Sequence, residues 1–231
     1  ILTVIFGLSF YFAFDVEGVI FGLVLSYVPY IWILVNELRH TRIDFSLLKP
    51  RKGFLINNYG INISGAVGGQ LDKLIIAPIL GFELLGNYSL AMQFLIILLL
   101  LPTIVFKYLL TQDSSGENTK NLKKITILAS IGLAVFGIVI LPMIIPVLFP
   151  KFIDTTIAIQ ILSVALIPAT IGIFYESKLL ALEKSKFPAI AKIIGTVFMI
   201  FGFLTLGPIY GIIGLSVILV ISSCIQVSVV I

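Results

Sequence analysis

Long apolar runs alternate along this chain with short segments that contain charge, glycine or proline. A helix needs about 20 mostly apolar residues to cross a hydrocarbon core of about 30 Å. Eight runs approach or exceed that length, and alternating ten-residue strands are absent. The pattern therefore predicts transmembrane helices over residues 1–14, 18–38, 53–80, 87–110, 122–149, 155–181, 187–206 and 209–231.

The composition agrees with this interpretation. Hydrophobic residues make up 59% of the chain and charged residues 11%, and the mean hydropathy is +1.19. A typical soluble domain has about 25% charged residues. We therefore predict an all-α integral membrane protein, a polytopic helical bundle. Both ends of the chain fall inside apolar runs, so we expect a piece of a longer protein, truncated at both ends.

Lysine and arginine are concentrated in alternate loops. The basic loops contain Arg39, Arg42, Lys49, Arg51 and Lys52, then Lys107, Lys120, Lys123 and Lys124, then Lys178, Lys184 and Lys186. Cytoplasmic loops retain positive charge, so these loops are expected inside and the loops near Glu83, Asp154 and Pro208 outside. This topology explains the net charge of +4. No interleaving of basic and aromatic residues indicates a nucleic-acid partner.

Common catalytic and cofactor signatures are absent. Cys224 and His40 are the only residues of their types, which leaves no Cys/His metal site. The sequence has neither a Gly-x-Ser-x-Gly elbow nor a phosphate-binding Gly-x-x-x-x-Gly-Lys loop. We therefore expect no enzyme, no catalytic residue, no metal and no cofactor.

Amides, glycines and a charged pair lie inside the apolar run 53–80. At 3.6 residues per turn, one helical stripe contains Asn58, Asn62, Gly65, Gly69 and the pair Asp72 and Lys73. Polar residues at this depth are costly and often line a substrate pathway. The alternative is helix packing, with Gly65 and Gly69 as a small-residue contact and the charged pair reaching the interface.

Other polar residues and prolines inside the spans give further candidates. We expect Lys192 to reach toward the cytoplasmic side, and Glu176 to form either a surface pair with Lys178 or part of a gate. Prolines remove a backbone hydrogen bond and can kink a helix. The predicted hinges are Pro102, Pro142 and Pro168, for which static bends are the alternative.

A short internal repeat links the second span to the last. Glu17-Gly18-Val19-Ile20-Phe21-Gly22-Leu23 matches Tyr210-Gly211-Ile212-Ile213-Gly214-Leu215, and both segments follow a short predicted outer turn. The match is consistent with a duplicated bundle.

The segment Gly81-Phe82-Glu83-Leu84-Leu85-Gly86-Asn87-Tyr88-Ser89-Leu90-Ala91 resembles the G-x-Y-x-x-A turn of polysaccharide-exporting flippases in the multidrug/oligosaccharidyl-lipid/polysaccharide superfamily. The later order is similar too: a helix with Pro102, a lysine-rich loop, Leu148-Phe149-Pro150-Lys151-Phe152 and Ile209-Tyr210-Gly211-Ile212-Ile213-Gly214. The resemblance covers most of the chain.

The resemblance implies a two-lobe (six plus six) transporter in a prokaryotic plasma (inner) membrane. Residues 1–38 would be the last two helices of the N-terminal lobe, 39–52 a cytoplasmic linker, and 53–231 the six-helix C-terminal lobe. The lobes would alternate access to a polyprenyl-pyrophosphate-linked oligosaccharide, among membrane lipids and with a proton or sodium as coupling ion. The implied cavity residues are Asn58, Asn62, Asp72, Lys73 and Gln93.

Three other functions stay open at this point. A multidrug/cation antiporter of the same superfamily would need acidic residues in its cavity, and a peptidoglycan-precursor flippase would share the fold and the lipid carrier. A membrane-embedded glycan polymerase would need a sizeable outer loop with acid and base groups. The outer loops expected here are only a few residues long.

Overall fold

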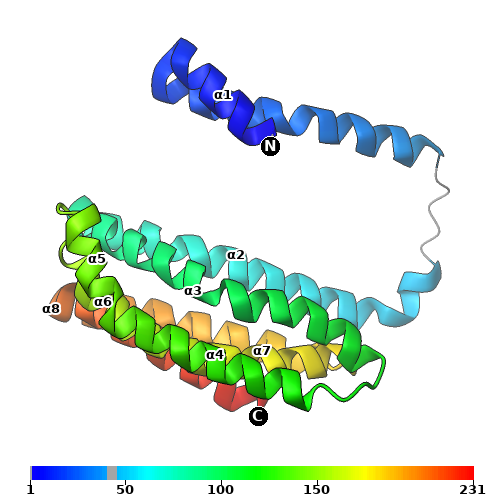
Figure 1. Cartoon of the computed structure of the whole chain (residues 1–231). Helices are drawn as coiled ribbons and strands as arrows, with labels where there is room; N and C mark the ends of the chain where they lie inside the picture. The colour runs from blue at the N-terminus through cyan, green and yellow to red at the C-terminus, as the bar shows by residue number, and fades with distance from the viewer. Residues whose placement is uncertain (1, 41–45) are drawn as a thin grey trace. The chain divides into compact units, whose positions relative to one another are not determined.

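The computed structural model describes residues 2–40 and 46–231, and every regular element in them is helical. Two compact units divide at residue 50. The first holds α1 (Leu2–His40) and most of the 3₁₀ helix Ser46–Arg51. The second holds α2 (Lys52–Leu80), α3 (Phe82–Ser114), α4 (Lys120–Val139), α5 (Leu141–Leu148), α6 (Thr155–Val164), α7 (Leu166–Ala181) and α8 (Lys186–Val230) (Figure 1). Residues 41–45 of the predicted linker, with Arg42, lie outside the described residues.

Helix α1 folds back on itself in its first half. The backbone leaves helical geometry at Phe14 and Asp15, where Asp15 has φ 53° and ψ −140°. After the reversal, Gly18 lies against the backbone carbonyl of Phe10, and the hydroxyl of Ser26 donates to that of Thr3 at 3.4 Å. The predicted boundary between the first two apolar runs therefore falls at a sharp reversal of the chain.

Helix α8 folds back in the same way, at Gly211, where φ is 54° and ψ is −133°. A Cβ on Gly214 would lie 2.5 Å from the carbonyl oxygen of Leu206, and a Cβ on Gly202 would meet the side chain of Ile218. Near the open end of this hairpin, the hydroxyl of Ser222 donates to the carbonyl of Gly195 at 2.8 Å. The two arms of α8 therefore touch along most of their length.

The two reversals are alike in detail. Asp15 and Gly211 have nearly the same φ and ψ. Three residues after each of them, Gly18 and Gly214 lie close to the backbone carbonyl of the residue eight positions earlier. The internal repeat is therefore visible in the backbone, but in a different register from the sequence match. Gly18 corresponds to Gly214 and not to Gly211. The two segments are aligned by their reversals at Asp15 and Gly211, and this backbone geometry is not visible in the sequence.

Replacing Asp15 with glycine is expected to stabilise the α1 hairpin by about 1 kcal/mol, because a side chain at positive φ costs about 1–2 kcal/mol. The measurement is hydrogen exchange of the amides of 2–26 in the full protein, which should slow about fivefold. The reverse change at the matching position, Gly211→Asp, should speed exchange in α8. Unchanged exchange in both variants would contradict the strain at this position.

The second unit is a bundle in which α3 contacts α2, α4, α6 and α7, and α8 contacts α2, α6 and α7. One apolar core lies among α3 to α7 and includes Leu95, Leu98 and Leu162. A second core joins α2 and α3 to both arms of α8, through Ile76, Tyr88, Phe203, Leu215 and Ile218. The hairpin at Gly211 thus supplies two walls of one core.

The all-helical membrane prediction agrees with the structure at a coarse level. Four described helices, α1, α3, α4 and α8, are long and apolar enough to cross a membrane, and α6 with α7, bent by 42°, could form a fifth span. Helix α2 is not among them, which fits the amides and glycines that interrupt its apolar sequence. The predicted span 122–149 is divided at Ile140 into α4 and α5. Eight passes and the two-lobe arrangement stay predictions.

Polar contacts fix both ends of α3. Near its start, buried Asn87 accepts the backbone N–H of Thr155 at 3.2 Å through Oδ1, and the Thr155 hydroxyl donates to the Asn87 carbonyl at 3.0 Å. Near its end, Asp113 accepts hydrogen bonds from Lys123 at 3.0 Å and from buried Ser177 at 2.9 Å. These contacts join α3 to α6 at one end, and to α4 and α7 at the other.

Removing the Thr155 hydroxyl by Thr155→Val is expected to destabilise the bundle by about 1–2 kcal/mol, because the buried Asn87 carbonyl loses a donor. The neighbouring Thr156 is a matched control, since its hydroxyl donates only to the nearby carbonyl of Ile153. Thermal unfolding in detergent should show a lower midpoint for Thr155→Val than for Thr156→Val. Equal midpoints would show that the α3–α6 contact contributes little.

Candidate functional site

Two neighbouring cavities lie between the helices of the second unit. The first, of about 210 Å³, lies among α3, α7 and α8, and the second, of about 280 Å³, among α2, α3 and both arms of α8. Lys192 and Gln226, one from each arm of α8, line both cavities. These two side chains therefore form the wall that the cavities share.

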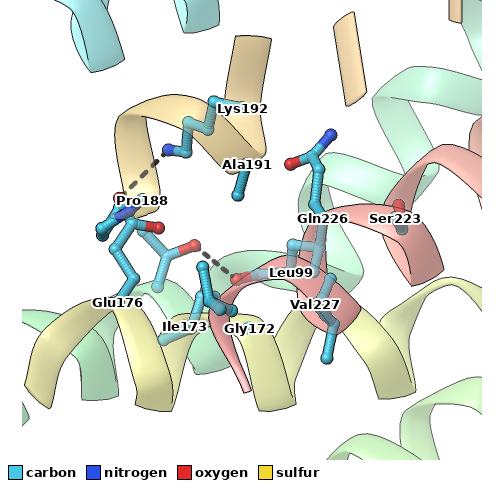
Figure 2. A pocket seen from close by; sticks show the side chains of 13 residues that line it. Leu99, Gly172, Ile173, Glu176, Pro188, Ala191, Lys192, Ser223, Gln226 and Val227 are labelled. Carbon is cyan, nitrogen blue, oxygen red and sulfur yellow. Dashed lines mark hydrogen bonds and ion pairs between the residues drawn. The ribbon is translucent and has the colours of Figure 1, made fainter. Parts of the chain in front are cut away.

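The first cavity contains an ion pair between α7 and α8. Lys192 Nζ lies 3.2 Å from Glu176 Oε1, and the two side chains are 33% and 18% exposed. Figure 2 shows the Lys192 stem extending toward Glu176, with Gln226 beside the opening. Most other lining residues are apolar, such as Ile173 and Val227. A charged pair in apolar surroundings is costly unless it is well satisfied, so its retention points to a role beyond packing.

The second cavity contains a buried carboxylate that makes no salt bridge within the part of the chain that the structure describes. Asp72 is 3% exposed, and its Oδ1 accepts the backbone N–H of Lys73 at 2.7 Å. Tyr88 is fully buried beside it, and its hydroxyl makes no well-formed hydrogen bond within the described residues. Several polar side chains complete the lining, namely Ser64, Thr196, Ser222 and Gln226. This hollow can receive hydrogen bonds and a positive charge from a ligand.

The residues predicted for the cavity are divided by the structure. Asp72 lines the second cavity, whereas Lys73 is exposed and does not line it. Asn58 donates to the carbonyl of Phe54 in its own helix at 3.0 Å. Asn62 on α2 and Gln93 on α3 are exposed and line neither cavity. Of the predicted set, only Asp72 belongs to the cavities described here.

The glycines of the predicted stripe make no close helix contact within the second unit. Gly65 and Gly69 both line the second cavity. A Cβ built on either would meet no atom within 4 Å among the described residues. A small-residue helix contact would bring a neighbouring backbone close to these positions, as happens at Gly214. Within the second unit, the two glycines therefore widen a hollow.

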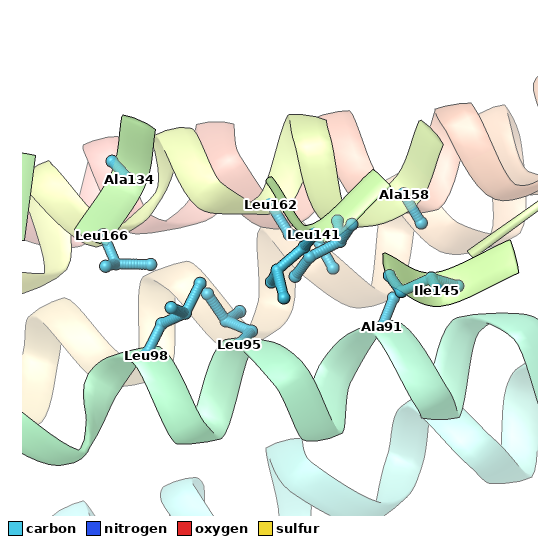
Figure 3. Packing of buried hydrophobic residues seen from close by; sticks show 10 residues of the cluster. Ala91, Leu95, Leu98, Ala134, Leu141, Ile145, Ala158, Leu162 and Leu166 are labelled. Carbon is cyan, nitrogen blue, oxygen red and sulfur yellow. The ribbon is translucent and has the colours of Figure 1, made fainter. Parts of the chain in front are cut away.

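The predicted hinges occupy three different settings. Pro142 follows the break between α4 and α5. Because proline has no backbone N–H, Pro142 cannot donate a hydrogen bond to the carbonyl of Ile138, and the side-chain amide of Gln160 donates to that carbonyl at 3.1 Å instead. Figure 3 shows Leu141 and Ile145 of α5 packed into the apolar core beside this break. Pro168 follows the 42° bend between α6 and α7, and α3 continues through Pro102. Movement at these prolines stays a prediction.

The sequence did not predict the ion pair of the first cavity. We expected Glu176 to form either a surface pair with Lys178 or part of a gate, and in the structure it pairs with Lys192. The expected reach of Lys192 toward the cytoplasmic side stays a prediction. The sequence did contain a signal, because Glu176, Lys192 and Gln226 are charged or amide residues inside three predicted spans. Only the fold of α8 brings Gln226 next to Lys192.

Comparisons with protein-family models, with curated proteins and with solved structures found no match. The cavities and their residues are therefore the basis for any functional conclusion.

Proposed function

We propose that this chain forms part of a polysaccharide flippase, a transporter that moves polyprenyl-pyrophosphate-linked oligosaccharide across a prokaryotic plasma membrane by alternating access. One observation supports the proposal above the others. Two cavities that contain charged and amide side chains meet at Lys192 and Gln226 inside a bundle whose cores are apolar. Polar and ionisable residues within membrane helices mark substrate and ion pathways.

The chemistry of the lining suits a sugar-bearing substrate with a charged group. Serine, threonine and glutamine side chains can exchange hydrogen bonds with sugar hydroxyls, and Lys192 provides a cation for pyrophosphate or an acidic sugar. Lys73, the cation suggested by the sequence, is exposed and lines neither cavity, so it is assigned a secondary role. The resemblance of Gly86-Asn87-Tyr88 and its surroundings to flippases of this superfamily points to the same substrate class.

A multidrug/cation antiporter is the second candidate, favoured by one observation. The charged side chains that line the two cavities are Asp72, Glu176 and Lys192, so one negative charge is in excess. A cationic substrate or coupling ion would balance this charge.

A transport assay in liposomes separates these functions. The full polypeptide that contains residues 1–231 is reconstituted, and movement across the bilayer is measured for a labelled polyprenyl-pyrophosphate oligosaccharide, a lipid-linked peptidoglycan precursor and a cationic dye. Movement of the oligosaccharide lipid without dye uptake is the expected result. Dye uptake alone would favour the antiporter, movement of the precursor alone a peptidoglycan flippase, and no movement of any of the three would contradict transport.

A further inference from the structure

Two carboxylates and one ammonium group lie around the wall between the cavities. Lys192 is bound to Glu176 on the side of the first cavity and also lines the second, where Asp72 lies. Among the described residues, no other charged side chain lines either cavity, and Tyr88 is the remaining titratable group. Lys192 therefore has two carboxylates to choose from, one on α7 and one on α2.

The two carboxylates differ in how well they are satisfied. Glu176 has its ion pair and 18% of its side chain remains exposed. Asp72 is almost fully buried and makes no ion pair among the described residues. Asp72 accepts the backbone N–H of Lys73 and lies next to the exposed Lys73 charge, but a buried carboxylate that lacks an ion pair is still costly. Lys192, which lines the same cavity, would lower that cost by pairing with it. In this structure Lys192 therefore pairs with the more exposed carboxylate, Glu176. The more deeply buried carboxylate, Asp72, makes no ion pair among the described residues.

The structure also provides the room and the flexibility that an exchange requires. Lysine has a flexible four-carbon stem and a compact charge that can turn toward either side. The second cavity has a volume of about 280 Å³, and two of the α2 residues that line it, Gly65 and Gly69, have no side chain. Because α8 contacts both α2 and α7, a change of partner would pull on a different neighbouring helix.

We propose that Lys192 exchanges its ionic partner between Glu176 on α7 and Asp72 on α2, and that the exchange draws α2 toward α8. Any event that neutralises Glu176, such as binding of a cation in the first cavity, releases Lys192 to Asp72. The two states differ in which cavity holds the ion pair. This inference concerns the movement of the helices and does not depend on which substrate is transported.

Disulfide formation between α2 and α8 tests the exchange. Gly69 lies one turn before Asp72 and Thr196 one turn after Lys192, and both line the second cavity. In a Cys224→Ser background of the full polypeptide in liposomes, cysteines are placed at positions 69 and 196. A Cβ at Gly69 meets nothing within 4 Å, so a bond there requires the two helices to approach each other.

Glu176→Gln is expected to raise the rate of this cross-link at least about fivefold, because Lys192 then has only Asp72 as a partner. Adding Asp72→Asn or Lys192→Met should abolish the rise. A Glu176→Gln rate equal to that of the parent would overturn the exchange. A rise in the cross-linking rate that persists when Asp72→Asn is added would also overturn the exchange, because such a rise would reflect loosening of α8.

A second cysteine pair reports on the fold in every background. The hydroxyls of Ser130 and Thr170 lie 2.9 Å apart between α4 and α7, so Ser130→Cys with Thr170→Cys should cross-link regardless of position 176. If the 130–170 pair does not cross-link in the Glu176→Gln protein, that variant has lost its fold and a second variant is used. In this double variant, Glu176→Lys with Lys192→Glu, the ion pair is kept but position 192 presents a carboxylate to Asp72.

The swap should lower the 69–196 cross-link at least about fivefold, and Asp72→Asn should restore it. A swap that cross-links at the parent rate would overturn the exchange. No transported substrate is present in these measurements, so failure of the exchange and failure of the flippase proposal are told apart.

Discussion

Replacing Lys192 with methionine is expected to slow transport by about tenfold or more, whereas Lys186→Met should stay close to the parent. Methionine keeps most of the length of the side chain but removes the charge, which leaves Glu176 as an unpaired carboxylate among apolar residues. An unpaired charge inside a transport pathway raises the barrier between the states of the transporter, and about 1.4 kcal/mol in that barrier corresponds to tenfold in rate. Lys186 is exposed at the start of α8 and lines neither cavity.

The measurement is the initial rate of transport in liposomes, per amount of reconstituted protein, with Lys192→Arg as a third variant. Arginine retains the positive charge and should recover part of the rate. Lys73→Met tests the cation that the sequence suggested, and Lys192→Met tests the cation that lines the cavities. Lys73→Met should lower the transport rate less than Lys192→Met. Equal rates for Lys192→Met and Lys186→Met would remove Lys192 from the transport pathway.

Replacing Gly214 with alanine is expected to destabilise the protein by about 3 kcal/mol. The new Cβ would lie 2.5 Å from the Leu206 carbonyl oxygen and 3.1 Å from the Tyr210 Cβ. A backbone carbonyl in a helix cannot turn aside as a side chain can, so the two arms of α8 would have to separate. Separation would also disturb the packing of Leu215 and Ile218 in the second core.

Gly132→Ala provides the matched control, because Gly132 lies inside α4 and a Cβ there meets nothing within 4 Å. Alanine at an open helical position is favoured over glycine by about 1 kcal/mol. The free energy of unfolding, measured with a denaturant in mixed micelles, should therefore fall for Gly214→Ala and rise slightly for Gly132→Ala. A parent-like value for Gly214→Ala would contradict the close approach of the α8 arms.

Hydropathy and punctuation in the sequence determined the helical class and many of the element boundaries. The reversal at Asp15 falls at a predicted boundary, because a chain that leaves an apolar run needs a turn, and turns favour glycine and aspartate. The reversal at Gly211 lies three residues past the boundary predicted at Gly207 and Pro208, inside the predicted span 209–231. The sequence also placed Asp72, Gly65 and Gly69 on one stripe of α2, and all three line the second cavity, while their role in transport stays a prediction. These features are local, so local patterns are sufficient to find them.

Only the tertiary structure decided which polar residues meet. Gln226 and Lys192 are 34 positions apart in the sequence and become neighbours because α8 folds back at Gly211. Glu176 selected Lys192 over the nearby Lys178 because α7 packs on α8, which turns one lysine toward the carboxylate and leaves the other exposed. Periodicity along one helix reports which residues share a face. It contains no information about the helix that this face will contact, so the ion pair and the two cavities had to come from the packing.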